Sequence, residues 1–264
     1  ERLAQIYLTG CPNLAWTAPH CAGNERRPGP RRIAIASRFL FDHSIGRLSL
    51  GLIRQLGMRS DCELICFNTA PTPNDVIQHE ISMQVTRMEV LAQDLDAARH
   101  MIAASEPDLL LYPEIGMDPV AYFLAFSRLA PVQTVSYGHP ITSGVPAIDY
   151  FLSCAAAEPR DPKAQATQYT ERLVPLAGLP FSYARPPSPE PAGHRTKFGL
   201  SDHNRIYFLA QNLFKVHPSM DIALRNILNG DPGGIVLLLE GHDPSWGKTL
   251  RQRFANSLGE AAER

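Results

Sequence analysis

The stretch PVQTVSYGHPITSG, residues 131–144, is an apolar run followed directly by a loop rich in glycine, histidine and hydroxyl residues. The first five residues have the composition of a buried strand. The rest suits a loop at a strand end, where backbone N–H groups and small polar side chains can approach a ligand. The same arrangement recurs at QNLFKVHP, residues 211–218, which follows another apolar run and places Lys215 next to an expected helix start. Two such loops, one in each half of the chain, indicate a ligand held between two domains.

Working outward from these loops, apolar runs alternate with amphipathic stretches along the chain. Strands are predicted at 32–37, 63–67, 108–112, 131–135, 147–152, 205–210 and 234–239. Helices are predicted at 45–56, 93–105, 119–128, 218–228 and 248–258. Ser44 and Asp118 are the expected N-caps of the first and third of these helices. Strands that alternate with helices predict right-handed βαβ units and therefore an α/β fold with mostly parallel sheets.

A proline-rich segment separates two such α/β regions, with prolines at 175, 180, 186, 187, 189 and 191. We predict a helical lead-in at 1–30, a Rossmann-like domain at 31–175 and a linker at 176–200. A second α/β domain is predicted to begin at 201 and to continue to 264. It is expected to be incomplete, because the chain stops within a charged helical pattern.

Composition restricts the classes of function. The formal net charge is −1 and the pI is about 6.8, which argues against a nucleic-acid-binding surface. We expect no membrane span, because no apolar run reaches the roughly 18 residues that a span requires. Cys62 and Cys66 lack a second Cys or His pair, so we interpret them as buried thiols of a strand and not as zinc ligands. The five sparse cysteines fit a reducing, cytoplasmic compartment.

Several side chains are candidates for chemistry. His43 lies between the first strand and its helix, where open α/β sheets bind ligands, and is interpreted as a base or ligand contact, with a helix-capping loop as the alternative. Lys215 is interpreted as a phosphate contact near a helix start, with a solvated lysine as the alternative. Among the carboxylates, Glu114 is a candidate, Asp118 fits a helix cap better and Asp149 fits a structural role. We assign no metal site, because we take the sequence to lack the D-x-D run that is the usual sign of a metal-dependent sugar transferase.

These clusters resemble glycosyltransferase family 41, which contains the protein O-GlcNAc transferases and the bacterial N-glucosyltransferases. The family's Gly-Tyr/His-Pro-x-Thr-Ser/Thr loop matches residues 138–143, and the following strand carries Asp149 and Tyr150. Its pattern of a polar pair, an aromatic residue, a lysine and a proline matches 211–218. The first strand with His43 and the segment 108–135 also match. These motifs agree in order and spacing over about residues 11–240.

The resemblance implies a GT-B-like architecture, in which two Rossmann-like domains with mostly parallel sheets flank the active site, the second domain here being truncated. It implies an inverting, metal-independent glycosyltransferase that moves GlcNAc or a hexose to protein side chains. The partners would be UDP-GlcNAc or UDP-glucose and a polypeptide acceptor, with no cofactor besides the donor. Tetratricopeptide repeats usually precede this region in the family, and only Glu1–Leu14 could correspond to one here.

The resemblance also implies roles for residues. Lys215 would contact the donor diphosphate and stabilise the departing UDP, and His43 would lie near the sugar and the acceptor as the second catalytic residue. The implied substrate-binding residues are Gly138, His139, Pro140, Thr142, Ser143, Gln211 and Asn212. A histidine that O-GlcNAc transferases carry after the second helix has no counterpart at 85–89, so His43 is the remaining candidate for the base. The family's further donor-binding loops would lie after Arg264.

Two other functions fit the same sequence. One is a UDP-sugar epimerase, an enzyme that shares the two-domain architecture. The other is a non-catalytic scaffold that binds a nucleotide sugar without turnover. Transfer of label from a UDP-sugar to a polypeptide distinguishes the transferase from both.

Overall fold

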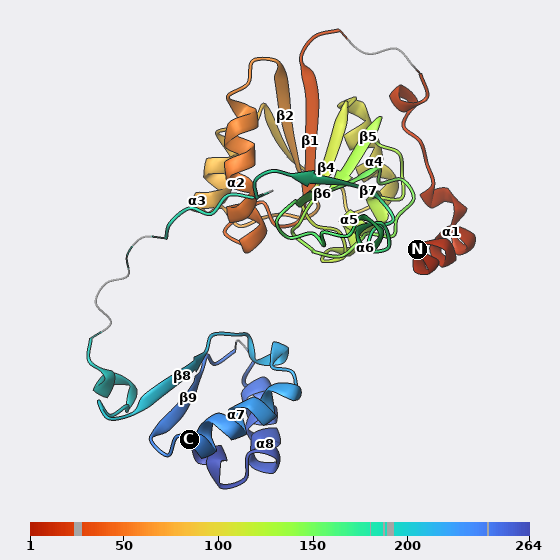
Figure 1. The fold of residues 1–264 in the computed structure, drawn as a ribbon. Coiled ribbons are helices and arrows are strands. Elements are labelled where there is room, and N and C mark those ends of the chain that lie inside the picture. The colour runs from red at the N-terminus through yellow and green to blue at the C-terminus, as the bar shows by residue number, and fades with distance from the viewer. Residues whose placement is uncertain (24–27, 180, 187, 189–192, 242) are drawn as a thin grey trace. The chain divides into compact units, whose positions relative to one another are not determined.

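The computed structural model describes residues 1–264 except 24–27, 180, 187, 189–192 and 242. The chain forms two units, residues 1–186 and 187–264 (Figure 1). Residues 180, 187 and 189–192, which belong to the predicted linker at 176–200, lie outside the described residues.

The first unit is built on one parallel sheet of seven strands in the order β3-β2-β1-β4-β5-β6-β7. The strands are β1 Arg31–Ser37, β2 Cys62–Asn68, β3 Arg87–Val90, β4 Leu109–Tyr112, β5 Val132–Val135, β6 Tyr150–Cys154 and β7 Arg172–Leu176. The predicted α/β class with a parallel sheet is therefore confirmed. The strand order reverses between β1 and β4, which is the point where open α/β sheets bind ligands.

Helices cover both faces of this sheet (Figure 1). They are α1 Arg2–Gly10, α2 Ser44–Gly57, α3 Val76–Ser82, α4 Leu95–Ala104, α5 Pro119–Leu124 and α6 Pro162–Ala166. Side chains of α2 and α3 form one buried cluster with one face of the sheet, and those of α4 and α5 form another with the opposite face. The lead-in joins the second cluster through Ala4 and Leu14, and the ring of Tyr7 packs edge-on against Phe123 at 5.1 Å.

The predicted elements of this unit are present, but several boundaries differ. His43, not Ser44, is the N-cap of α2. Helix α5 ends at Leu124 because the chain then turns to meet the lead-in, where the Arg128 N–H donates to the carbonyl of Trp16. Strand β6 starts at Tyr150 and not at 147.

Four short elements were not predicted from the sequence: β3, β7, α3 and α6. Each has only four to seven residues, and β3 and β7 have no buried residue. Strand β3 and the two short helices lack the long apolar run or periodicity on which the predictions depended, and the apolar run of β7 is interrupted by Pro175. Strand β7 contains Pro175, which is tolerated because β7 is the edge strand of the sheet.

The second unit contains two parallel strands, β8 Arg205–Leu209 and β9 Gly234–Leu238. Helices α7 Ser219–Gly230 and α8 Pro244–Ser257 lie on one side of them (Figure 1). Their shared core consists of Leu213, Val216, Leu224, Leu228, Leu250, Phe254, Leu258 and Ala261. Helix α8 begins four residues before its predicted start, because Asp243 accepts from the Ser245 N–H as an N-cap and Pro244 occupies the first helical position.

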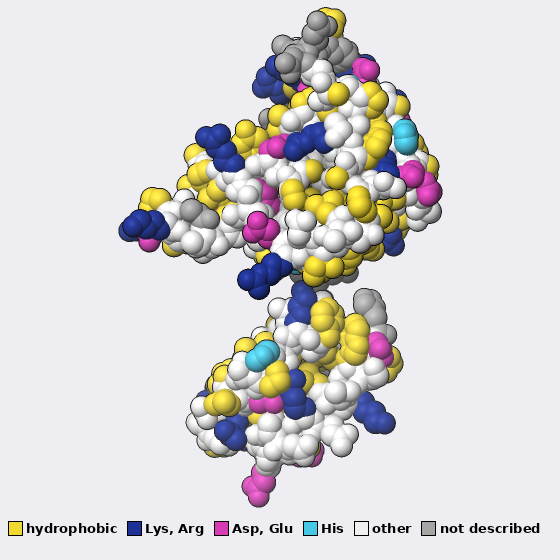
Figure 2. Space-filling view, turned by 90° about the vertical axis from the view of Figure 1, so that its right-hand side faces the viewer, with side chains coloured by type: hydrophobic (Ala, Val, Ile, Leu, Met, Phe, Trp, Pro, Cys, Tyr) yellow, Lys and Arg dark blue, Asp and Glu magenta, His cyan; other side chains and the backbone are white. Residues whose placement is uncertain are grey.

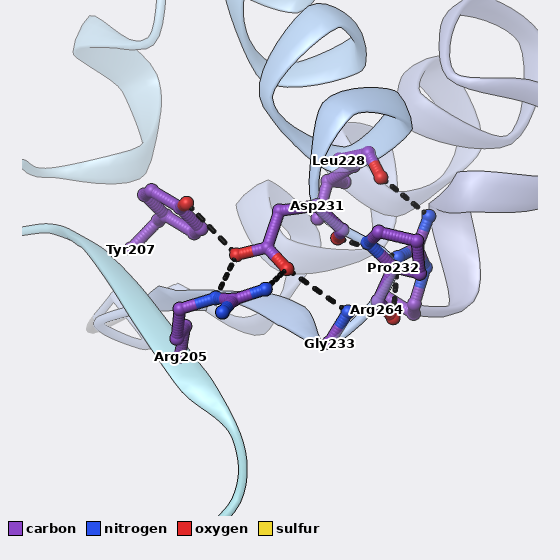
Figure 3. Close-up of polar contacts among 7 residues, drawn as sticks. All are labelled: Arg205, Tyr207, Leu228, Asp231, Pro232, Gly233 and Arg264. Carbon is purple, nitrogen blue, oxygen red and sulfur yellow. Dashed lines mark hydrogen bonds and ion pairs between the residues drawn. The ribbon is translucent and has the colours of Figure 1, made fainter.

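A buried carboxylate holds the amino ends of β8 and β9 together (Figure 3). Asp231 pairs with the guanidinium of Arg205 and accepts from the hydroxyl of Tyr207 and the N–H of Gly233, each at 3.0 Å. These bonds, led by that to Arg205, lower the pKa of Asp231 to about 2. Arg264 donates to the carbonyls of Leu228, Asp231 and Pro232 beside it. This cluster is at the end of the strands opposite to the predicted ligand loops, so its role is structural.

The visible surface of each unit mixes apolar side chains with charges of both signs, and neither sign gathers into one continuous patch on that face (Figure 2). Among the described residues, no helix is both long enough and apolar enough to cross a membrane.

Candidate functional site

Three loops of the first unit meet where β1, β4 and β5 end, and Gly138 is at their junction. Its N–H donates to the carbonyl oxygen of Pro113 at 2.9 Å. A Cβ added at Gly138 would lie 2.5 Å from that same oxygen and 2.7 Å from Cδ1 of Ile45, at the start of α2. Only glycine allows this approach, which brings the loop after β5 against both of its neighbours.

His43 is oriented by the helix that it caps. Its Nδ1 accepts from the Ile45 N–H at 3.2 Å, and its ring stacks on Phe39 with 4.3 Å between centroids. Partial burial lowers the pKa of His43, which favours the neutral imidazole. In a neutral ring whose Nδ1 accepts, the proton is on Nε2. His43 therefore presents an N–H donor at the ligand edge of the sheet.

His139 lies over the loop that follows β4. Gly116 has a φ of +102°, and a Cβ there would be 3.2 Å from Cδ2 of the His139 ring. The half-buried imidazole thus rests on a glycine that has no side chain to displace it. Pro140, the next residue, is exposed.

Thr142 and Ser143 are tied to Glu171, a residue that the sequence did not single out. Thr142 Oγ1 donates to Glu171 Oε2 at 2.7 Å, and the Ser143 N–H donates to Oε1 at 2.8 Å. The Ser143 hydroxyl also bonds to Oε1, and Thr142 Oγ1 accepts from the Thr170 N–H. Both hydroxyls therefore hold the loop to the start of β7. Nothing in the sequence spacing marks Glu171, because it approaches from 28 residues away.

We expect Glu171→Ala to loosen this loop, because it leaves the donors of Thr142 and Ser143 without their buried acceptor. Losing hydrogen bonds to a buried charged group should lower the free energy of unfolding by ~2 kcal/mol. Amide hydrogen exchange at 141–145 should rise, whereas Glu80→Ala, which removes an exposed carboxylate, should leave it unchanged. Unchanged amide hydrogen exchange at 141–145 in Glu171→Ala would show that Glu171 does not hold this loop in place.

The three candidate carboxylates have different surroundings. Asp118 accepts from the Ala121 N–H at 2.9 Å and from Thr69 Oγ1 at 2.8 Å, so it caps α5 as predicted. Asp149 is structural, as predicted, and bonds to Arg128 and to the Gln133 N–H.

Glu114, the third candidate, is fully buried and accepts from Ser37 Oγ at 2.7 Å. Its Oε2 has no hydrogen-bond partner among the described residues. Burial, partly offset by the Ser37 bond, raises the pKa of Glu114 to about 8.

The sequence does contain one triplet with D-x-D spacing, Asp94-Leu95-Asp96, so our premise that the motif is lacking was wrong. In the structure Asp94 caps α4 by accepting from the Ala97 N–H, and Asp96 pairs with Arg99. The described residues include no group of three or more His, Cys, Asp or Glu side chains placed to hold a metal ion.

The second candidate loop follows β8 in the second unit. Residues Leu213–Lys215 form a short 3₁₀ helix, and α7 begins four residues after Lys215. Gln211, Asn212 and Lys215 are exposed. The Lys215 ammonium lies 5.8 Å from the ring centroid of Phe214, which packs edge-on against Trp246 at 5.0 Å. The Phe214 ring, which packs against Trp246, therefore lies beside the lysine ammonium.

A cavity of about 210 Å³ opens at the carboxyl end of β9 in the same unit. It is lined by Leu213, Leu238, Leu239, Glu240, Gly247, Leu250, Arg251 and Phe254. Leu213 belongs to both the candidate loop and the cavity, so the loop and the hollow share one edge of this small sheet.

Comparisons with known proteins agree with the resemblance to glycosyltransferase family 41. The chain is 32% identical over 131 residues, half of its length, to a tomato (Solanum lycopersicum) protein described as the probable UDP-N-acetylglucosamine–peptide N-acetylglucosaminyltransferase SPINDLY. It is 23% identical over 235 residues, 86% of its length, to the similarly described SEC of Arabidopsis thaliana. A shorter match, 32% over 62 residues and 24% of the chain, is to a UDP-glucose:protein N-β-glucosyltransferase of Actinobacillus pleuropneumoniae. No family model matches the chain.

The chain covers only 13%, 23% and 10% of these three proteins. Among solved structures, an O-GlcNAc transferase of Thermobaculum terrenum matches 98% of this chain with a TM-score of 0.73 and 21% identity, and the chain covers 49% of it. This match shows the fold, and the expected GT-B-like α/β class is confirmed.

Proposed function

We propose, from its resemblance to the peptide O-GlcNAc transferases and protein N-glucosyltransferases, that this chain is part of an inverting glycosyltransferase. The enzyme would move GlcNAc or a hexose from a UDP-sugar to a side chain of a polypeptide. The observation that carries the proposal is the match over 86% of the chain to a protein described as a peptide N-acetylglucosaminyltransferase. The two candidate loops, each at the carboxyl end of a parallel strand, support it.

The proposed chemistry assigns the leaving group to the second unit. Breaking the sugar–phosphate bond develops negative charge on the departing UDP, and a fixed cation there lowers the barrier. Lys215 is the proposed cation, and the exposed Gln211 and Asn212 are proposed to contact the same nucleotide. We propose that these side chains act without a metal ion, as the family resemblance implies.

The first unit is proposed to bind the sugar and the acceptor. Gly138 and His139 would line the sugar pocket, with Pro140, Thr142 and Ser143 shaping the loop from which they project. His43 would contact the sugar or the acceptor. Because its Nδ1 caps α2, we propose that it contributes the Nε2 proton as a hydrogen-bond donor, and it can serve as a base only if that cap opens.

The cellular setting belongs to the same proposal. Buried Cys66 and Cys154 are free thiols, which fits the reducing environment of the cytoplasm. That α1 belongs to a tetratricopeptide repeat remains a prediction.

We expect Lys215→Ala to lower transfer by about 100- to 1,000-fold, the usual effect of removing one group that stabilises developing charge. The assay follows label from UDP-GlcNAc and from UDP-glucose into polypeptide, with the intact protein. Lys248→Ala, which removes an exposed lysine on α8, is the matched control and should transfer normally. A UDP-sugar epimerase would convert the label without transferring it, and a scaffold would do neither. Transfer that is unaffected by Lys215→Ala would contradict the assigned role.

A further inference from the structure

Glu114 lies where the loops that follow β1, β4 and β5 meet, yet it touches no solvent. It is two residues past the end of β4 and has an exposed fraction of 0%. A glutamate this deeply buried is rare unless it is paired or hydrogen-bonded. It cannot contact a substrate directly, so any role in the proposed reaction must pass through its neighbours.

The first set of neighbours leads to His43. Glu114 Oε1 accepts from Ser37 Oγ at 2.7 Å, and the same hydroxyl oxygen accepts from the Phe39 N–H at 2.9 Å. The ring of Phe39 in turn stacks on the imidazole of His43 at 4.3 Å, with 22° between the planes. Glu114 thus fixes Ser37, Ser37 fixes the backbone of Phe39, and Phe39 provides the surface on which His43 rests.

The second set leads to Gly138 and His139. The Cβ of Glu114 lies 3.1 Å from the position that a Cβ on Gly138 would occupy, so the two backbones are in close contact. His139 follows directly and lies over Gly116, which is two residues after Glu114. One buried side chain therefore adjoins both loops that carry the imidazoles of the ligand edge.

We propose that Glu114 is a positioning residue, which sets the spacing between the His43 loop and the Gly138–His139 loop through its bond to Ser37. The inference rests on the proposed transferase function for its kinetic consequences, but the geometric claim stands separately. A neutral side chain that accepts the Ser37 hydrogen bond is sufficient for this role, because the link uses one oxygen of the carboxyl group and no charge.

The test compares Glu114→Gln, Glu114→Ala and Ser37→Ala in the intact protein. Glu114→Gln keeps an acceptor for Ser37 and should retain kcat within about threefold. Glu114→Ala and Ser37→Ala remove the bond and should lower kcat by about 10- to 100-fold, more than they change KM, the extent expected when a misplaced group weakens transition-state contacts. Ser37→Ala is the smaller change and keeps the test available if Glu114→Ala does not fold.

The matched control is Ser153→Ala. Ser153 is also fully buried and donates to a glutamate, Glu158, at 2.5 Å, but this pair belongs to the end of β6. Ser153→Ala should cost a similar amount of stability while leaving kcat as it was. If Ser153→Ala lowers kcat as much as Ser37→Ala, the effect is general loosening of the sheet and the proposal is overturned.

A second measurement does not depend on activity. NMR titration of the His43 and His139 imidazoles should show shifted resonances and an altered His43 pKa in Ser37→Ala and Glu114→Ala, and unaltered values in Glu114→Gln and Ser153→Ala. The proposal is overturned if the imidazole resonances of folded Ser37→Ala match those of wild type. It is also overturned if Glu114→Gln lowers kcat as much as Glu114→Ala does. If no wild-type transfer is found but the imidazoles respond as expected, the proposed function fails and the positioning role stands.

Discussion

Gly46→Ala is expected to lower the free energy of unfolding of the first unit by ~3 kcal/mol or more and to remove the proposed transfer activity with it. Gly46 is in the first turn of α2. A Cβ there would lie 2.1 Å from the carbonyl oxygen of Phe41 and 2.8 Å from that of Phe39. These are backbone atoms, so the collision cannot be relieved by a rotamer change, and overpacking against backbone is costly. The loop before His43 would have to move away from α2.

Chemical denaturation of the Gly46→Ala protein and the transfer assay measure both effects. Gly10→Ala is the matched control. Gly10 is also a helix residue, the last of α1, and a Cβ there would meet nothing within 4 Å. That substitution should be neutral or stabilise by up to ~1 kcal/mol through helix propensity. A Gly46→Ala protein as stable and active as Gly10→Ala would show that the loop at 39–41 is not held against α2.

The second large effect is a fall in stability with rising pH that is caused by Glu114. Its folded pKa of about 8 lies above the ordinary glutamate value of 4.5, so the folded state binds more protons between these values. Stability therefore decreases as pH rises from about 4.5 to about 8 and levels off above that. A separation of this size corresponds to ~5 kcal/mol for a fully buried carboxyl.

Denaturation of wild type and Glu114→Gln across this pH range measures the effect. The Gln variant cannot titrate, so it should lack this fall and should exceed wild type in stability at pH 9. Glu80→Gln changes an exposed carboxylate that pairs with Arg54 and should follow wild type within ~1 kcal/mol. Parallel curves for wild type and Glu114→Gln would mean that Glu114 is ionised at ordinary cost in the folded protein.

The long apolar runs were enough to predict the sheet. The strands at 32–37 and 63–67 were found within a residue or two of β1 and β2, because buried parallel strands need continuous apolar residues. The shorter β3 has no such run and that of β7 is interrupted by Pro175, so their sequences do not mark them as strands. Helix α5 is the opposite case, because its sequence predicts more helix than forms. The helical pattern continues past Leu124, but the chain there bonds to the lead-in and the helix stops.

The candidate site was predicted by position but not by contact. His43, Gly138 and His139 were expected at the strand ends, and the structure brings their loops together around Gly138. Two sets of contacts were not foreseen. Thr142 and Ser143 bind Glu171, and Ser37 joins Glu114 to the loop of His43. In each pair the partners are 28 or more residues apart. Periodicity and local motifs carry no information on such pairs. The roles assigned to the nine candidate residues remain predictions.

The interior position of β1, between β2 and β4, has a consequence for how the chain is made. One edge of β1 pairs with β2, which follows closely, but the other pairs with β4, and the N–H of Arg32 donates to Asp108 across 76 residues of sequence. A nascent polypeptide that has left the ribosome as far as β2 would carry an apolar strand with one row of N–H and C=O groups open to other chains. Such non-local pairing is slow. We therefore expect newly synthesised molecules to need chaperone protection until residues 109–112 emerge and close that edge.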